Sequence, residues 1–215
     1  MGTEQTDWDA YYARPALTAR VTRQFTQRTL ISLMARHCHA HPDLAICELG
    51  GANSVFAEPI LRALPVRSYH IIDTNARGLA LLSKRVARDP RLSWERGDVL
   101  LPDPIHFERY DLVFSVGLIE HFSAADTRRS IDTHFAFARA GGVVLLTFPT
   151  PTWLYRVVRR GLEITGNWTF PDERPLGFEE VAGAVSRRGR MVCRLINWPV
   201  VLTQGIVVAQ RVPVR

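Results

Sequence analysis

The chain has 215 residues, 47% hydrophobic and 22% charged, with a formal net charge of +6. This is an ordinary globular composition, and the length suits one sizeable core better than two domains. No apolar run approaches the roughly 20 residues that a membrane-spanning helix needs. The positive balance permits an anionic partner, but charge alone is weak support for nucleic-acid binding, and we expect none.

The N-terminal residues 1–12 are acidic and polar, which is not typical of a secretory signal. Three cysteines cannot form a fully paired disulfide framework, so we expect a reducing, cytoplasmic setting. Residues 15–38 predict one or two helices, and we expect 1–42 to form an N-terminal helical extension. His37 and His41 have a spacing that could hold a metal, but a polar helix end is the better interpretation, and we predict no metal site.

Five nearly continuous apolar runs predict strands that are buried on both faces: 44–50, 68–74, 92–98, 110–117 and 142–149. Segments with apolar residues at helical spacing lie between them, at 54–64, 76–88 and 123–140. Ser123 and Asp126 are expected to cap the last helix, and Gly141–Gly142 to end it. This alternation predicts right-handed crossovers and a parallel sheet with helices on both faces.

The C-terminal part differs from this pattern. After a helical segment at 178–189, the runs 191–200 and 203–212 are strand-like with no helix between them, which predicts an antiparallel hairpin. We therefore expect a single domain over 1–215. Its parts are a core at 43–149, an insertion at 150–177, and a final helix and closing hairpin at 178–215.

The turn "GGANS" follows Glu48 at the end of the first predicted strand. In open parallel sheets, ligands bind beyond the carboxyl ends of the strands, where the strand order reverses. Small residues at that place let the backbone approach a ligand, and the next helix offers free N–H groups. A tight connection without a ligand is the alternative.

Acidic residues also end the next two predicted strands. Asp73 is placed to accept hydrogen bonds from ribose hydroxyls, and Asp98 can meet an adenine amino group. Each could instead be a helix cap or a solvated turn. Together, three consecutive strand ends predict a nucleoside site.

The order "ICELGGANS", "HIID", "RGDV", "YDLVFSVGLIEHF", "ARAGGVVLLTFP" resembles the class I S-adenosylmethionine-dependent methyltransferases. The resemblance covers about residues 44–150 in motif and the rest in topology. It implies an α/β, doubly wound, Rossmann-like fold with a mostly parallel seven-stranded sheet, S-adenosyl-L-methionine as cofactor and S-adenosyl-L-homocysteine as product. The cofactor-binding residues that it implies are Glu48, Gly50, Gly51, Ala52, Asp73, Thr74, Asp98, Val99, Ser115, Gly117 and Phe122.

This chain departs from the family's turn, Glu-x-Gly-x-Gly-x-Gly, because Ala52 and Ser54 replace the second and third glycines. Ala52 is acceptable if its φ is negative, with Gly51 and Asn53 supplying unusual dihedrals. A degenerate member without cofactor is the alternative. The nicotinamide fingerprint Gly-x-Gly-x-x-Gly does not fit "GGANSV".

Methyl transfer to a heteroatom is an in-line displacement, in which the protein mainly aligns the reactants and excludes water. A base is needed only when the acceptor must lose a proton of high pKa. His121, after the fourth strand, is the candidate base, and a structural role for Glu120–His121 is the alternative.

The insertion at 150–177 contains an amphipathic basic helix, with Trp153 and Val157 on its apolar face. Three interpretations compete: a lid over the acceptor pocket, a membrane-surface or partner-binding helix over 153–164, and a plain packing helix. Because Trp168, Phe170 and Arg174 follow, an aromatic or anionic acceptor would suit a lid.

The expected function is S-adenosylmethionine-dependent methylation of a small molecule, with O-, N- and C-methylation all open, as is the oligomeric state. An RNA or protein methyltransferase is the alternative enzyme. Against the nucleic-acid type, "SVGL" stands where the amino-methylating enzymes usually carry an Asn/Asp-Pro-Pro-aromatic tetrapeptide. A non-catalytic S-adenosylmethionine-binding or scaffold protein is the alternative of another class.

Overall fold

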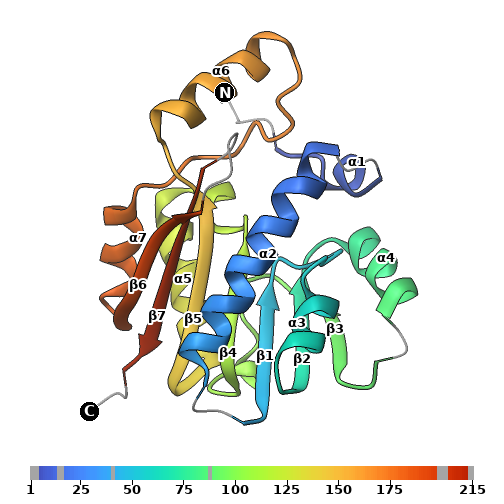
Figure 1. Cartoon of the computed structure of the whole chain (residues 1–215), viewed down its shortest axis with the longest axis vertical. Helices are drawn as coiled ribbons and strands as arrows, with labels where there is room; N and C mark the ends of the chain where they lie inside the picture. The colour runs from blue at the N-terminus through green and yellow to red at the C-terminus, as the bar shows by residue number, and fades with distance from the viewer. Residues whose placement is uncertain (1–4, 14–16, 40–41, 87–88, 198–202, 213–215) are drawn as a thin grey trace.

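The computed structural model describes residues 5–13, 17–39, 42–86, 89–197 and 203–212. Its centre is a seven-stranded sheet in the order β3-β2-β1-β4-β5-β7-β6 (Figure 1). The first five strands are parallel, and β7 runs antiparallel to both β5 and β6. The predicted mostly parallel sheet with a closing hairpin is confirmed. The strands are β1 Leu44–Leu49, β2 Val66–Asp73, β3 Leu92–Arg96, β4 Tyr110–Val116, β5 Ala138–Pro149, β6 Gly189–Asn197 and β7 Gln204–Arg211.

Helices cover both faces of this sheet. The α-helices are α1 Trp8–Ala13, α2 Leu17–His37, α3 Ala57–Ala63, α4 Ala76–Val86, α5 Ala124–Phe137, α6 Trp153–Ile164 and α7 Phe178–Val185, and the 3₁₀ turns are η1 Pro104–His106 and η2 Ile119–His121. Apolar side chains of α2, α3 and α4 pack with one set of strand residues, and those of α5 and α7 pack with the other. The central strands are buried on both sides, which explains why they read as continuous apolar runs.

The strand order reverses between β1 and β4. The chain runs outward through β1, β2 and β3, and then returns to place β4 beside β1. The connections that leave β1 and β4 therefore diverge at their carboxyl ends, which opens a crevice for a ligand in folds of this kind. In Figure 1 this edge faces α1 and α6.

One predicted boundary is wrong. Helix α5 ends at Phe137 and β5 begins at Ala138, so Gly141 and Gly142 lie inside the strand and do not end the helix. Gly141 has a φ of +75°, and the pairing of β4 with β5 shifts register at this point. The glycine therefore serves a strand irregularity. The predicted cap at Ser123 is confirmed, since its hydroxyl accepts from the backbone N–H of Asp126.

The N-terminal helical extension is present as α1 and α2. Helix α1 contacts the start of α4, because Asn75 donates to Asp9 at 2.9 Å. None of the helices in the described ranges is long and apolar enough to cross a membrane.

Candidate cofactor and acceptor site

The turn after β1 is confined on two sides by its neighbours. Gly50 has a φ of +74°, and its N–H donates to the carbonyl of Ile72 at 2.9 Å. A Cβ on Gly50 would lie 2.9 Å from the Leu118 side chain, and one on Gly51 would lie 2.6 Å from the Glu48 carboxyl carbon. A side chain at Gly50 or Gly51 would therefore clash with its neighbours, and the positive φ of Gly50 also favours glycine there.

The two departures in this turn have local explanations. Among non-glycine residues in the described part of the chain, Glu108 alone has a positive φ. The φ of Ala52 is therefore negative, which makes alanine acceptable at this position. The expectation that Gly51 and Asn53 supply the unusual dihedrals is wrong, because the left-handed residue is Gly50.

The methyl group of Ala52 is fully buried and points at Gly78 in α4, where an added Cβ would lie 2.6 Å from it. Ser54 accepts from the N–H groups of Phe56 and Ala57, so it stabilises the start of α3. Neither replacement places a bulky group at the carboxyl edge of the sheet.

Acidic side chains stand at three successive strand ends. Glu48 is 2% exposed and accepts from the Tyr69 hydroxyl at 2.7 Å. Burial raises the pKa of Glu48 to about 7, against the hydrogen bonds from Ser54 and Tyr69. The side chain is therefore part of the support beneath the turn.

Asp73 connects the β1 turn to the end of β2. Its two carboxylate oxygens accept from the N–H of Ala52 at 3.0 Å and from that of Asn75 at 2.7 Å. Burial raises the pKa of Asp73, and these backbone hydrogen bonds oppose the shift. A carboxylate has about four acceptor positions, so capacity for ligand hydroxyls remains.

Asp98, just after β3, is half-buried and accepts from the N–H of Leu100 at 2.8 Å. Val99 beside it is buried, and its carbonyl accepts from Thr133. Thr74 is exposed after β2. The strand order therefore brings the predicted residues of β1, β2 and β3 to one edge of the sheet.

Two buried polar atoms near the end of β4 fit a polar ligand. The Ser115 hydroxyl and Oε2 of Glu120 have no hydrogen-bond partner among the described residues. Gly117, with a φ of +69°, lies between them in sequence. Burial raises the pKa of Glu120 well above its usual range.

His121 lies beyond β4, and its side chain is 8% exposed. Its Nδ1 donates to Oδ1 of Asp172 at 3.0 Å, which leaves Nε2 as the acceptor nitrogen. Burial lowers the pKa of His121, and the contact with Asp172 opposes this only in part. The imidazole is therefore neutral near pH 7 and can accept a proton.

The carboxylate of Asp172 is itself held by hydrogen bonds. Thr6 donates to Asp172, and the hydrogen bonds from Thr6 and His121 lower the pKa of Asp172 although burial opposes this. Asp172 therefore stays ionised and fixes the tautomer and orientation of His121.

Aromatic rings from two distant segments enclose His121. The ring of Trp8 lies edge-on to the imidazole with centroids 4.9 Å apart, and Phe170 lies at 5.9 Å. Tyr11 contacts Phe170 at 5.3 Å. Helix α1 and the segment 168–174 thus meet over the end of β4.

Hydrogen bonds and ring contacts anchor residues 150–177, and the predicted substrate residues of this segment do not all lie on the same side of α6. Tyr155 is the buried residue of α6 and donates to Glu173, while Arg159 stacks on Trp168 at 5.0 Å. Trp153 and Val157 lie on the opposite side, 74% and 62% exposed.

Arg174 is fully engaged within the protein. It binds Glu180 at 2.8 Å, the Thr127 hydroxyl at 3.0 Å and the Phe122 carbonyl at 3.5 Å. The half-buried Phe122 is thereby connected to the insertion. This arrangement makes Arg174 an anchor of the segment and leaves it little capacity for an anionic ligand.

A surface depression of about 420 Å³ lies elsewhere, at the amino end of β5, and contains none of these residues. His37 and His39 line it together with Gly141 and Gln210. His41, the second member of the predicted pair, lies outside the described residues.

Sequence reasoning placed Phe170 in the acceptor segment but missed Trp8 and Asp172, because each lies far along the chain from His121. The "WDAYY" and "FPDER" segments are dense in aromatic and acidic residues. That density was the available signal, but it did not reveal which residues would meet.

Comparisons with known proteins agree with this geometry. Residues 47–144 match the family model of a methyltransferase domain. A search of curated proteins finds no match.

Solved structures of methyltransferases share the fold at low identity. The N-methyltransferase NodS from Bradyrhizobium japonicum WM9, in complex with S-adenosyl-L-homocysteine, has 15% identity and a TM-score of 0.64, over 86% of each chain. Magnesium protoporphyrin IX methyltransferase (ChlM) from Synechocystis PCC 6803, also with this ligand, has 15% identity and a TM-score of 0.70, over 89% of this chain and 84% of that one.

The CurJ carbon methyltransferase has 15% identity and a TM-score of 0.68, over 94% of this chain and 57% of that one. The family model covers slightly less than half of the chain, and the strand order and the motifs at the strand ends agree with the fold of the class I S-adenosylmethionine-dependent methyltransferases.

Proposed function

We propose that the protein transfers a methyl group from S-adenosylmethionine to a small-molecule acceptor. The observation that carries this proposal is the convergence of the glycine turn, Asp73 and Asp98 at the carboxyl edge where the strand order reverses. The neighbours NodS and ChlM, whose structures contain S-adenosyl-L-homocysteine, support the choice of cofactor.

The residues present fit this cofactor. Asp73 would accept from the ribose hydroxyls, Asp98 and Val99 would face adenine, and the Gly50–Ala52 turn would hold the methionine portion above Glu48. The unpartnered Ser115 hydroxyl offers a further polar contact. When bound, the cofactor supplies an electrophilic methyl group on a sulfonium.

His121 would act as a general base on the acceptor. Its neutral Nε2 is free for a proton, and Asp172 stabilises the imidazolium that forms. The rings of Trp8 and Phe170 would exclude water and orient the acceptor.

A small and at least partly aromatic acceptor suits this enclosure better than an anionic one, because Arg174 is occupied by Glu180 and two further protein oxygens. A nucleic acid or folded protein would need an open approach over His121, where α1 and the segment 168–174 meet. The magnesium protoporphyrin IX methyltransferase ChlM and the CurJ carbon methyltransferase are examples of small-molecule methylation in the same fold.

We also propose that residues 150–177 form the acceptor segment of a single cytoplasmic domain, with 43–149 as its cofactor core. A membrane contact through α6 is a second candidate for this segment. It is favoured by the exposed apolar side chains of Trp153, Val157 and Ile164.

Calorimetry with S-adenosylmethionine and S-adenosylhomocysteine tests the cofactor site. We expect Asp73→Ala to weaken binding by about 1.5–3 kcal/mol, the usual loss for a hydrogen bond to a charged group. Asp73→Asn keeps the shape and separates charge from packing. Asp43→Asn, exposed at the opposite end of β1, is the matched control and should bind normally.

Wild-type affinity in Asp73→Ala would remove Asp73 from the site. A folded wild-type protein that binds neither ligand would contradict the proposal as a whole. Screening small molecules, RNA and protein with labelled cofactor then distinguishes the acceptor classes. Binding without transfer to any of them would favour the non-catalytic alternative.

A further inference from the structure

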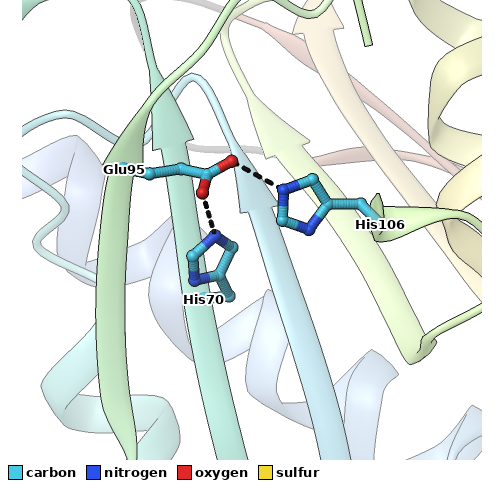
Figure 2. A group of neighbouring side chains, drawn as sticks. All are labelled: His70, Glu95 and His106. Carbon is cyan, nitrogen blue, oxygen red and sulfur yellow. Dashed lines mark hydrogen bonds and ion pairs between the residues drawn. The ribbon is translucent and has the colours of Figure 1, made fainter. Parts of the chain in front are cut away.

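Three side chains from separate elements converge beside β3. His70 comes from β2, Glu95 from β3 and His106 from η1 (Figure 2). Nε2 of His106 lies 2.6 Å from one carboxylate oxygen of Glu95, and Nε2 of His70 lies 3.6 Å from the other. Their ligand atoms all lie within 4.8 Å of one another.

The backbone explains why these residues meet. His70 pairs with Ser93 across the β2–β3 ladder, so the two side chains share a face of the sheet, and Glu95 lies two residues further on that same face. The η1 turn is fixed by Pro104 and by Asp103, whose side chain accepts from the N–H of Ile105 at 2.9 Å. This turn presents His106 to the other two side chains.

The second nitrogen of each imidazole is held by a hydroxyl. Nδ1 of His70 lies 2.8 Å from Ser93 Oγ, and Nδ1 of His106 lies 2.9 Å from the Tyr110 hydroxyl. Such partners orient histidine ligands in metal sites, because they fix the ring and direct its other nitrogen at the ion. Both Nε2 atoms therefore point at a single carboxylate, as Figure 2 shows.

Nε2 of His70 is also buried without a hydrogen-bond partner among the described residues. Its 3.6 Å separation from Glu95 is too long for a hydrogen bond. A cation between these atoms would satisfy it, since a neutral imidazole nitrogen and a carboxylate oxygen are both electron-pair donors.

The donor set selects the kind of ion. Two imidazole nitrogens and one carboxylate suit zinc or a neighbouring late first-row dication, and are a poor match for calcium or magnesium. Zinc bonds of about 2.0–2.1 Å place tetrahedral ligand atoms about 3.4 Å apart. Small side-chain movements would therefore bring the three ligand atoms to the spacing that zinc needs. The side chain of Glu95 is 42% exposed, which gives the ion an entry path, whereas His70 and His106 are 16% and 7% exposed.

We propose that His70, Glu95 and His106 bind one divalent late first-row transition ion, with solvent completing the coordination. The prediction of no metal site from sequence did not consider this triad. The ion would tie β3, one of the two edge strands of the sheet, to η1. Asp98 lies in the segment between these two elements, so the site would brace the loop that carries it.

Zinc titration of the metal-free full-length protein tests this proposal. We expect one zinc ion per chain by calorimetry against a competing chelator. His70→Ala and His106→Ala should each weaken zinc binding by about a hundredfold or more, and Glu95→Gln, which keeps the shape, by at least about tenfold. His37→Ala, in a separate histidine-containing surface, should leave binding unchanged.

Ser93→Ala tests the orienting contact, because it removes only the hydroxyl that holds His70. We expect a loss of zinc affinity of about tenfold, the lower end for such partners. Zinc should also raise the melting temperature of the wild type, and raise that of Glu95→Gln by less at the same zinc concentration.

The proposal is wrong if the folded wild type takes up no zinc, or if uptake persists unchanged in the histidine variants. Should those variants fail to fold, Glu95→Gln and Ser93→Ala decide, since both preserve the packing. Unchanged zinc binding in both would overturn the site. None of these readouts depends on methyl transfer, so they stand apart from the proposed function.

Discussion

At the level of single residues, the proposed chemistry depends on the pairing of His121 with Asp172. An isolated histidine in an apolar enclosure would have a lowered pKa but no fixed orientation. The carboxylate 3.0 Å from Nδ1 sets the tautomer, so that Nε2 is the nitrogen that takes a proton. The proposed general base is thus His121 together with Asp172, two residues that lie 51 positions apart in the sequence.

We therefore expect His121→Ala to lower turnover by about a hundredfold or more, with cofactor affinity nearly intact. Asp172→Asn should lower it by about tenfold or more, because the wrong tautomer is favoured. Asp132→Asn on α5 is the control. Steady-state kinetics over pH should show that the wild type loses rate as pH falls below the lowered pKa of His121. Unchanged turnover in His121→Ala, or lost cofactor binding, would assign His121 to structure.

A second prediction concerns Gly78 in α4, where replacing glycine with alanine should lower stability, the reverse of its usual effect in a helix. Glycine to alanine in a helix normally stabilises by up to about 1 kcal/mol. Here the added Cβ would lie 2.6 Å from the Ala52 methyl and 3.0 Å from the Tyr12 ring. We expect Gly78→Ala to destabilise by about 1–3 kcal/mol in chemical denaturation.

Removing the opposing methyl group tests this cause. Ala52→Gly should restore part of the stability lost in Gly78→Ala, giving a favourable coupling in a double-mutant cycle. Additive effects of the two changes would show that Ala52 and Gly78 do not oppose each other.

Among the elements, α6 divides into two faces with different roles. Its inner face holds Tyr155 and Arg159 against Glu173 and Trp168, which fixes the segment that carries Asp172. Its outer face exposes Trp153, Val157 and Ile164. An exposed apolar face of this kind is available for closure over an acceptor or for insertion into a membrane surface.

Replacing Trp153 and Val157 with Asp distinguishes these uses. If α6 closes as a lid, the acceptor KM should rise by about tenfold or more, or turnover should fall, with cofactor affinity little changed. Replacing the exposed Arg156 and Arg160 with Gln tests the alternative, and Arg159 is spared because it holds the inner face. Activity that survives in solution while association with anionic vesicles is lost would make α6 a membrane contact.

For the whole molecule, burial of titratable groups couples folding to pH. His134 on α5 is fully buried, and its Nδ1 donates to the Ser130 carbonyl at 2.7 Å. Burial lowers its pKa from 6.5 to about 4. The unfolded chain therefore binds a proton between these values that the folded protein does not, and stability is lost as pH falls through this window.

Denaturation at pH 7 and pH 5 measures this effect. A window of about 1.5 pH units corresponds to roughly 2 kcal/mol at His134. We expect a non-titrating His134→Gln variant to lose about that much less stability than the wild type between the two pH values. Comparing the two proteins cancels the opposite contribution of Glu48, whose raised pKa favours folding at low pH. Equal losses would show that His134 titrates normally.

Local pattern determined much of this protein. Strands buried on both faces read as nearly continuous apolar runs, because most side chains on either side contact the core, and the acids Asp73 and Asp98 lie at or just after the ends of β2 and β3. The order of these motifs was enough to indicate a methyltransferase fold and to predict a cofactor edge. Even the hairpin of β6 and β7 was visible, because no helical pattern separates the two runs.

Tertiary structure alone decided which distant residues meet. The left-handed residue of the turn is Gly50, where the sequence had suggested Gly51 and Asn53, and α5 ends at Phe137 because pairing with β4 extends β5 backwards past Gly141. Asp172 reaches His121, and Glu95 reaches His70 and His106, through loops and ladder register that no local periodicity encodes. Contacts between segments remote in sequence depend on the packing of the whole chain, whereas strands and their ends depend on neighbouring residues.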